Sequence, residues 1–364
     1  MKIPQLTDIQ RLSIDSMRTF VQQDVKPNES LLRFGTPSRE QVLELTQAVA
    51  EFGLPGLAVP KALGGSGMDW VIQARLFEEL VKGSVELATV VLVNMVAVEL
   101  LLSQPALCGQ YLPDLLAGRS IAGLGSILSD SGHGKTLQAQ RKGGHLLLNG
   151  NIEAVTNGQW ADFLFSAVAL DKHESCFVLL DRRRDRYETR HVSRDNDVVN
   201  ARVQVTGTHL SEDFRLGEAG AGSQLSRRLL DFLRLHEGIA RVAQGQAILD
   251  AALAGQANPV TAAKPTAGEQ LISLHLAEMI TQLESARLMC HHGLVLAQEG
   301  QDCEMESSMA RFLAQGAVER VERHAAWVHG GEGERRQTSP LQLRPLASDR
   351  ASVDVRSIVS HWVH

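Results

Sequence analysis

Apolar residues recur at helical spacing over about the first 120 residues. Ser38 and Gln41 form the pattern of a capping box, and the apolar positions in residues 42–52 follow it at spacings of one turn. A second, largely apolar run covers residues 90–102. Residues 54–67, LPGLAVPKALGGSG, hold two prolines and four glycines, which predicts an ordered loop between helices. The first block is therefore predicted to be helical.

The pattern changes between about residues 121 and 220. Short apolar segments such as HLLLNG, ADFLFSAVAL and SCFVLL alternate with turn residues, which is typical of strands. Residues 145–149 predict a strand that enters an Asn-Gly hairpin turn at Gly150. This block is predicted to be a β-domain of about 100 residues.

Long helical patterns return from Ser223 onward. One buried stripe is predicted within residues 270–299, and its members are Leu276, Ile280, Leu283, Ala286, Cys290 and Leu294. A further helix is predicted from Met305 to Val328, ending at the pair Gly330-Gly331. Long helices in this order usually form a bundle. The expected domains are thus 1–120, 121–222 and 223–364, in an α+β chain.

Composition narrows the class of protein. The chain of 364 residues is 44% hydrophobic and 21% charged, with a net charge of −6, which argues against non-specific nucleic-acid binding. We count no apolar run of the roughly 18–20 residues that a membrane span needs, and the polar N-terminus does not resemble a signal peptide. Four cysteines lie far apart without CxxC spacing, so we expect reduced thiols, no metal site and a cytoplasmic location.

Seven segments match short motifs in a fixed order. They are FGLPGLAVPKALGGSGMDW (52–70), FEEL (77–80), YLPDLLAGRSIAG (111–123), LSDSGHGKT (128–136), NGNIEAVTNG (149–158), LRLHEGIARVAQGQAILDAAL (233–253) and HGGEG (329–333). The first resembles GLxGLxVPExYGGxG, the fifth NGxKxWITNG and the last GGNG, all of them signatures of the acyl-CoA dehydrogenase family. The resemblance spans essentially the whole chain. It implies an N-terminal helical domain, a middle antiparallel β-domain and a C-terminal four-helix bundle.

The resemblance also implies a chemistry. Family members bind FAD between the β-domain and the bundle, with an acyl-CoA or acyl-carrier-protein thioester against the flavin ring. A carboxylate removes the α-proton while the β-hydrogen leaves as hydride to the flavin, so the protein supplies position and a base.

The usual base is missing from this chain. In the family it lies in a segment that reads Arg-Asp-Ala, a short spacer and Glu-Gly-Thr. Aligning that Asp with Asp349 places the base at Ser357, and no glutamate follows Glu334. A minority of the family keeps the base on the helix that opens the C-terminal domain, where this chain has Leu233.

Several expected cofactor contacts are also replaced. The arginine expected for the FAD pyrophosphate and a nearby phenylalanine correspond to Pro259 and Ala262. The tryptophan of WITNG is Ala154, and a glutamine just before the paired glycines is Trp327. The cofactor-binding residues that the resemblance retains are Ser129, Thr156, Gly330 and Gly331. The two glycines are equally consistent with a helix stop.

Two other carboxylates are candidate bases. Glu237 lies one helical turn after Leu233 and would share its face, although a buried ion pair with Arg234 or Arg241 is the simpler interpretation. Asp354 lies three residues before Ser357. The run DRRRDR (181–186) predicts a solvated turn, with phosphate binding for a CoA or carrier arm as the alternative.

Three functions remain open at this point. The first is an FAD-dependent oxidation of an acyl thioester that uses a non-standard base. The second is a catalytically inactive partner subunit of a heteromeric acyl-CoA dehydrogenase, and the third is a cofactor-free acyl-thioester-binding protein. The family resemblance implies a homo-oligomer or a heteromer with a related dehydrogenase.

Overall fold

The structure is a computed structural model of the chain. It describes residues 6–127, 137–171, 174–191, 200–217, 222–254, 267–328 and 358–359. Two compact units are present. The first consists of Met1–Leu76 and Glu86–Leu230, and the second consists of Phe77–Val85 and Asp231–His364.

Helices form the N-terminal part of the first unit, as predicted. Their bounds are α1 (Asp8–Phe20), α2 (Glu29–Phe34), α3 (Arg39–Ala50), the start of α4 (Trp70–Gly83), α5 (Val85–Leu102) and α6 (Pro105–Leu116), with a π-helical turn η1 (Val21–Val25) directly after α1. Short 3-10 turns η2 (Lys26–Asn28) and η3 (Lys61–Leu63) lie between them.

The predicted capping box at Ser38 is confirmed. The Ser38 hydroxyl accepts from the Gln41 amide at 3.3 Å, and the Gln41 side chain accepts from the Ser38 amide at 2.9 Å. This exchange satisfies two amides that the first turn of α3 would otherwise leave unpaired. Residues 54–67 form the expected ordered loop, in which Gly64 adopts a left-handed φ of 90° that a side chain would disfavour.

Helix α5 is more apolar than we expected from the sequence. Its 18 residues have a mean hydropathy of 2.1, so length and composition alone would allow a membrane span, contrary to the expectation that no run reaches that length. However, 83% of this window is buried inside the protein. A helix that is hydrophobic on all sides is a core helix when the fold covers it on all sides. Asn94 on α5 accepts a hydrogen bond from the Ala122 amide at 2.9 Å.

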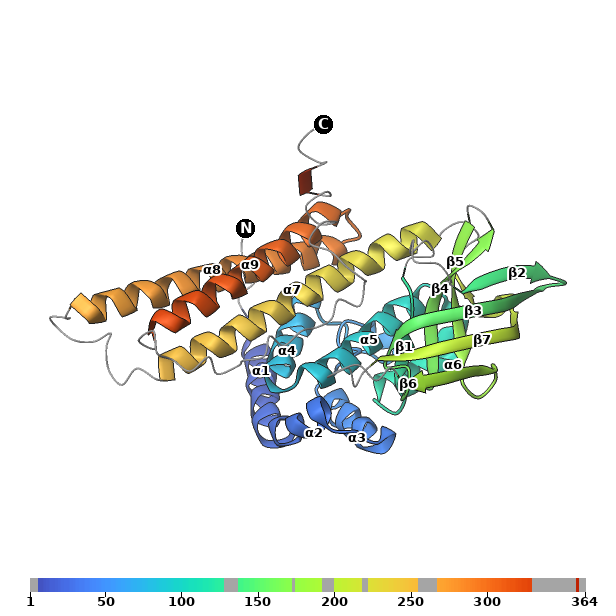
Figure 1. The fold of residues 1–364 in the computed structure, drawn as a ribbon, viewed down its shortest axis with the longest axis horizontal. Helices are drawn as coiled ribbons and strands as arrows, with labels where there is room; N and C mark the ends of the chain where they lie inside the picture. The colour runs from blue at the N-terminus through green and yellow to red at the C-terminus, as the bar shows by residue number, and fades with distance from the viewer. Residues whose placement is uncertain are drawn as a thin grey trace. The chain divides into compact units, whose positions relative to one another are not determined.

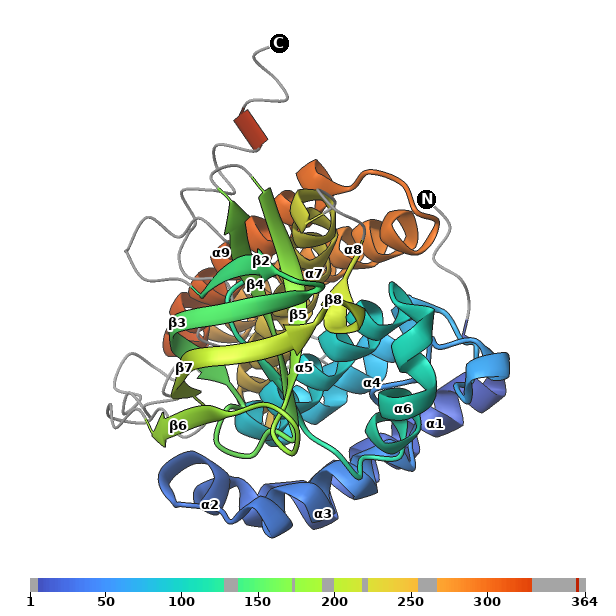
Figure 2. The same ribbon diagram turned by 90° about the vertical axis from the view of Figure 1, so that its right-hand side faces the viewer.

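A mixed, mostly antiparallel sheet completes the first unit (Figure 2). Its strands in the described part are β1 (Ala122–Leu124), β2 (Gln138–Lys142), β3 (His145–Thr156), β4 (Phe163–Asp171), β5 (Glu174–Asp181), β6 (Tyr187–His191), β7 (Asn200–Ser211) and β8 (Arg215–Leu216), with the 3-10 turn η4 (Glu212–Phe214) before β8. The order is β6-β7-β3-β1-β4-β5-β8, and β2 pairs with β3 and β4. Alternating residues of these strands form one apolar core.

The predicted hairpin turn at Asn149-Gly150 is wrong. Strand β3 continues through both residues and stays paired with β7, with a register shift between Leu148 and Gly150. Gly150 has a φ of 137°, and the Asn149 side chain accepts from the Gly207 amide at 2.8 Å. The Asn-Gly pair therefore makes a β-bulge within a long strand, because pairing with β7 holds the backbone extended on both sides of it.

Three long helices run side by side in the second unit (Figure 1). They are α7 (Gly222–Ala254), α8 (Ala267–Gln298) and α9 (Glu304–Val328), joined by the end of α4. The predicted stripe on α8 is buried except at Ile280, which is 44% exposed. Met279, fully buried, takes its place. Leu276 and Leu283 pack with it against residues of α7 and α9.

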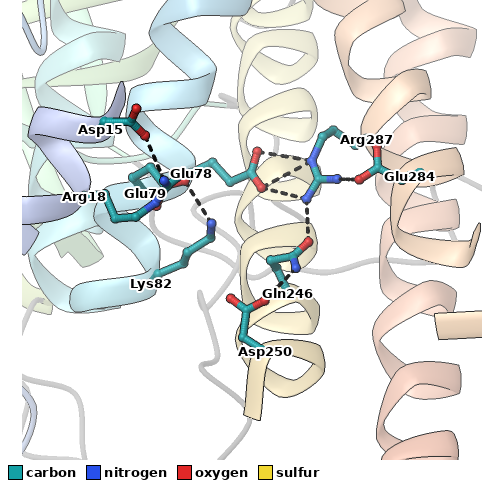
Figure 3. A network of polar contacts seen from close by, with 9 residues as sticks. All are labelled: Asp15, Arg18, Glu78, Glu79, Lys82, Gln246, Asp250, Glu284 and Arg287. Atoms are coloured by element: carbon teal, nitrogen blue, oxygen red, sulfur yellow. Dashed lines mark hydrogen bonds and ion pairs between the residues drawn. The ribbon is translucent and has the colours of Figure 1, made fainter. Parts of the chain in front are cut away.

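A buried ion pair connects α4 and α8 within the second unit (Figure 3). Arg287 donates to Glu78 from Nη2 at 2.8 Å and from Nε at 3.2 Å, and the two side chains are 7% and 3% exposed. The same guanidinium donates to Gln246 of α7 at 3.0 Å and also contacts Glu284. Gln246 in turn donates to Asp250 at 2.9 Å. One guanidinium thus joins three helices.

Replacing Arg287 by Met should lower the free energy of unfolding by about 3–5 kcal/mol, because Glu78 would remain buried without its counter-charge. Adding Glu78→Leu should recover most of that loss, since the pair is then replaced by apolar contacts. Chemical denaturation of both variants measures this. Arg320→Met, which removes a partly exposed guanidinium bonded to Gln282, is the control. A loss below about 1 kcal/mol for Arg287→Met would show that the pair contributes little.

Candidate functional site

Leu233 and Glu237 lie one turn apart on α7, so their side chains project from the same face of the helix. Leu233 is 1% exposed and carries no group that can take a proton. Glu237 is 7% exposed. The sequence prediction that Glu237 shares the face of Leu233 therefore agrees with the helix.

An arginine of α9 holds the Glu237 carboxylate. Arg311 donates from Nη1 to Oε2 of Glu237 at 3.0 Å, and the two side chains are 15% and 9% exposed. Burial lowers the pKa of Arg241, one turn further along α7, and the nearby Glu237 carboxylate opposes this shift. The predicted pairing of Glu237 with an arginine is therefore present, with Arg311 as the partner at hydrogen-bond distance.

Arg234, the other arginine considered for Glu237, pairs with Asp231 instead. Its Nη1 donates to the Asp231 carboxylate at 3.1 Å, and the Ser307 hydroxyl donates to the same oxygen at 2.7 Å. Burial raises the pKa of Asp231, while Ser307 and Arg234 oppose the shift. Sequence reasoning missed this carboxylate, although its position two residues before Leu233 was visible.

A neutral histidine lies between the residues of these two ion pairs along α7. His236 is fully buried, with ring centroids 4.1 Å from Phe232 and 5.7 Å from Phe77. Its Nδ1 lies 2.8 Å from the Phe232 carbonyl, so Nδ1 carries the proton that it donates. Burial lowers the pKa of His236 to about 4. Among the described residues, no group hydrogen-bonds to its Nε2.

Thr156, the retained cofactor-binding candidate, lies at the end of β3 in the first unit. It is 6% exposed, and its hydroxyl donates to the Asn200 side chain at 3.0 Å. Its neighbour Asn157 has a φ of 62° and is fully buried. The Asn157 amide donates to the carbonyls of Ala122 at 3.0 Å and Val90 at 3.3 Å. The TNG segment therefore fixes the end of β3 to β1 and α5.

The described residues do not fit a complete flavin site. The hydroxyl proton of Thr156 is already engaged by Asn200, and Ala154 leaves no aromatic wall beside it. Trp327 is 67% exposed and stacks on His275 of α8, with ring centroids 6.1 Å apart. The remaining predicted site residues lie outside the described residues, namely Ser129, Gly330, Gly331, Asp354 and Ser357. Pro259 and Ala262 also lie outside them.

One further carboxylate titrates near neutrality. Burial raises the pKa of Glu99 on α5 to about 7, although Arg228 of α7 opposes this at a distance of 3.4 Å. Both residues belong to the first unit. Glu99 was not predicted as a site residue from the sequence, because it lies inside the apolar run of α5. Buried groups with pKa values near 7 are enriched at functional sites.

The DRRRDR run forms the predicted turn, between β5 and β6. Arg182 and Arg183 are exposed, whereas Arg184 lies over the Phe214 ring at 3.3 Å and pairs with Asp185 at 2.5 Å. Within the described ranges, no group of three or more His, Cys, Asp or Glu side chains is arranged to hold a metal ion.

Comparison with known proteins gives consistent matches. Residues 7–119 match the acyl-CoA dehydrogenase N-terminal domain, and residues 220–349 match the acyl-CoA dehydrogenase C-terminal domain. The chain is 26% identical to an acyl-CoA dehydrogenase of Bacillus subtilis over 87% of this chain and 86% of that protein. It is also 26% identical to the caffeyl-CoA reductase-Etf complex subunit CarC of Acetobacterium woodii, over 80% of each chain. The fold matches butyryl-CoA dehydrogenase from Megasphaera elsdenii with a TM-score of 0.83 over 100% of both chains, at 21% identity.

Replacing Asn157 by Gly should lower the free energy of unfolding by about 2–4 kcal/mol, because the carbonyls of Val90 and Ala122 lose a buried donor. Asn157→Ala should cost about 1 kcal/mol more than Asn157→Gly, since alanine strains the left-handed backbone at this position. Urea unfolding of both variants measures the difference. Equal stabilities would contradict the claim of a backbone constraint.

Glu99→Gln should stabilise the protein above pH 7 by up to about 3 kcal/mol. The folded pKa of about 7 is above the ordinary value of 4.5, so the carboxylate destabilises the fold increasingly as pH rises through this window. The difference between variant and wild type should vanish near pH 4. Denaturation at several pH values measures it, with Glu44→Gln on exposed α3 as the control.

The stability contribution of His236 depends on pH in the opposite direction to that of Glu99. His236 is present in both the wild type and the Glu99→Gln variant. Its folded pKa of about 4 is below the ordinary 6.5, so its contribution is lost as pH falls from 6.5 to 4. Subtracting wild type from variant at each pH cancels it. A difference that is constant with pH would contradict the buried titration of Glu99.

Proposed function

Because this chain belongs to the acyl-CoA dehydrogenase family, we propose that it serves in the flavin-dependent oxidation of an acyl thioester as a subunit whose catalytic base comes from a related chain. The observation that carries this proposal is on α7. The position of the alternative base is the buried Leu233, and the carboxylate one turn later is ion-paired with Arg311.

The ion pair makes Glu237 a poor base in its observed arrangement. Proton abstraction would neutralise the Glu237 carboxylate, whose Oε2 accepts a hydrogen bond from Arg311 at 3.0 Å. Loss of that negative charge would weaken a buried ion pair, which opposes proton uptake by Glu237. Arg241 adds a second positive charge beside the same carboxylate.

In this proposal the related chain binds the FAD as well as supplying the base. The arginine for the pyrophosphate is replaced in the sequence, and the Thr156 hydroxyl is bonded to Asn200. FAD bound by the related chain would supply the hydride acceptor. This chain would contribute structural support, contacts between subunits and binding of the thioester. The similar protein of Acetobacterium woodii is named as a subunit of a caffeyl-CoA reductase-Etf complex, so a relative of this chain acts within a larger assembly.

A second candidate is a self-sufficient enzyme that uses Glu237 as a non-standard base. Its burial and its position one turn from Leu233 favour this role, because burial in general raises the pKa of a carboxylate toward the value that proton abstraction needs. Asp354 is the other carboxylate proposed for it. In either case the substrate is an acyl-CoA or acyl-carrier-protein thioester, and the expected location is cytoplasmic.

Purified alone, incubated with FAD and then desalted to remove unbound FAD, the protein should show no flavin absorbance band and should not oxidise acyl-CoA substrates. Co-expressed with a related dehydrogenase from the same source that retains its base glutamate, it should co-purify as a yellow, active complex. Absorption spectra and an electron-acceptor assay with acyl-CoA and carrier-bound substrates measure both.

Variants of the complex separate the two candidates. Glu237→Gln should leave turnover within about twofold of wild type, whereas replacing the related chain's base should lower it by about 10²–10⁴-fold. Glu319→Gln, at an exposed position of α9, is the control. A flavin band and turnover from this chain alone, lost in Glu237→Gln, would favour the second candidate. Thioester binding with neither flavin nor a partner would indicate a cofactor-free binding protein.

A further inference from the structure

A groove lies among the N-terminal helices of the first unit, formed by α1, the π-helical turn η1 and the end of α3. Its volume is about 370 Å³. The side chains that matter for its chemistry are Thr19, Phe20, Gln23, Asp24, Glu51 and Phe52. None of these residues belongs to the family signatures, apart from Phe52 at the edge of the first one.

Two aromatic rings form the apolar part of the groove. The ring centroids of Phe20 and Phe52 lie 5.0 Å apart, with an angle of 34° between the planes. Both side chains are half-buried, so part of each ring faces the groove. The face of a phenyl ring carries partial negative charge and attracts cations.

Two carboxylates give the groove a negative charge. Asp24 lies on the π-helical turn and Glu51 directly follows α3, and both are exposed. In the part of the chain that the structure describes, neither carboxylate makes a hydrogen bond or an ion pair. Among the residues that the structure describes, no lysine, arginine or histidine lines the groove. The negative charge is therefore not neutralised by the groove's own residues.

Polar groups without charge complete the lining. Gln23 supplies an amide and Thr19 a hydroxyl, although the Thr19 hydroxyl already donates to the Asp15 carbonyl at 3.0 Å. A ligand that suits this groove has an apolar body for the rings and a positive charge for the carboxylates. Anions and neutral hydrocarbons match only part of this surface.

We propose that the groove binds a small organic ammonium ion. The two phenyl rings contact the alkyl groups around the nitrogen, and Asp24 and Glu51 supply the counter-charge. Each contribution is modest at an exposed site, so the affinity is in the millimolar range. The site is independent of the proposed oxidation, because none of its residues takes part in that chemistry.

Choline is the probe, and 3,3-dimethylbutan-1-ol, which replaces its quaternary nitrogen by carbon, is the uncharged isostere. NMR titration of the full chain with each compound at constant ionic strength should give saturable choline binding, with the isostere about tenfold weaker. Asp24→Asn and Glu51→Gln should each weaken choline binding, and the double variant should weaken it about tenfold.

Glu44→Gln, on the exposed face of α3 and outside the groove, is the matched control and should bind choline like wild type. Phe52→Leu should weaken choline binding more than isostere binding, because it removes the ring but keeps apolar contact. If that variant fails to fold, the two exposed carboxylate variants still decide the matter. Equal binding of choline and isostere, unchanged binding by the double variant, or no choline binding would each overturn the proposal.

Discussion

The buried pair Glu78–Arg287 is the constraint on which the second unit depends. Two charges that are almost fully removed from water are tolerable only when each satisfies the other. Their geometry therefore determines where α4 and α8 can lie relative to each other. The bond from Arg287 to Gln246 adds α7 to the same constraint. This explains the first glutamate of the FEEL segment, Glu78, whereas Glu79 pairs with Lys82 at 2.9 Å.

Ionic partners also determine what α7 can do. Three carboxylate or imidazole groups occur within seven residues, and each has a bonded partner: Asp231 with Arg234 and Ser307, His236 with a backbone carbonyl, Glu237 with Arg311. The charges of α7 stabilise helix contacts within the second unit, which supports the proposal that the base comes from a related chain.

Local patterns in the sequence predicted local structure well. The capping box at Ser38 and the start of α9 needed only neighbours along the chain, and both were right to within a residue. The motif order predicted the family and its fold. Predictions that depended on distant partners were less secure. Asn149-Gly150 has the chemistry of a hairpin turn, but pairing with β7 converts it to a bulge. Ile280 and Met279 fit the stripe of α8 almost equally, and packing against α7 and α9 chose Met279. Arg311 lies 74 residues from Glu237, so no spacing rule could have identified it as the partner.

The burial of α5 has a consequence for how the chain is made. Asn94 is satisfied by the backbone of β1, and the carbonyl of Val90 by Asn157, which follows Asn94 by 63 residues. Ribosomes add about 5–20 residues per second, so these partners emerge several seconds after α5. During that interval the most apolar of the described helices has no sheet to cover it. The N-terminal helices therefore cannot complete their packing before the strands of the sheet have been synthesised.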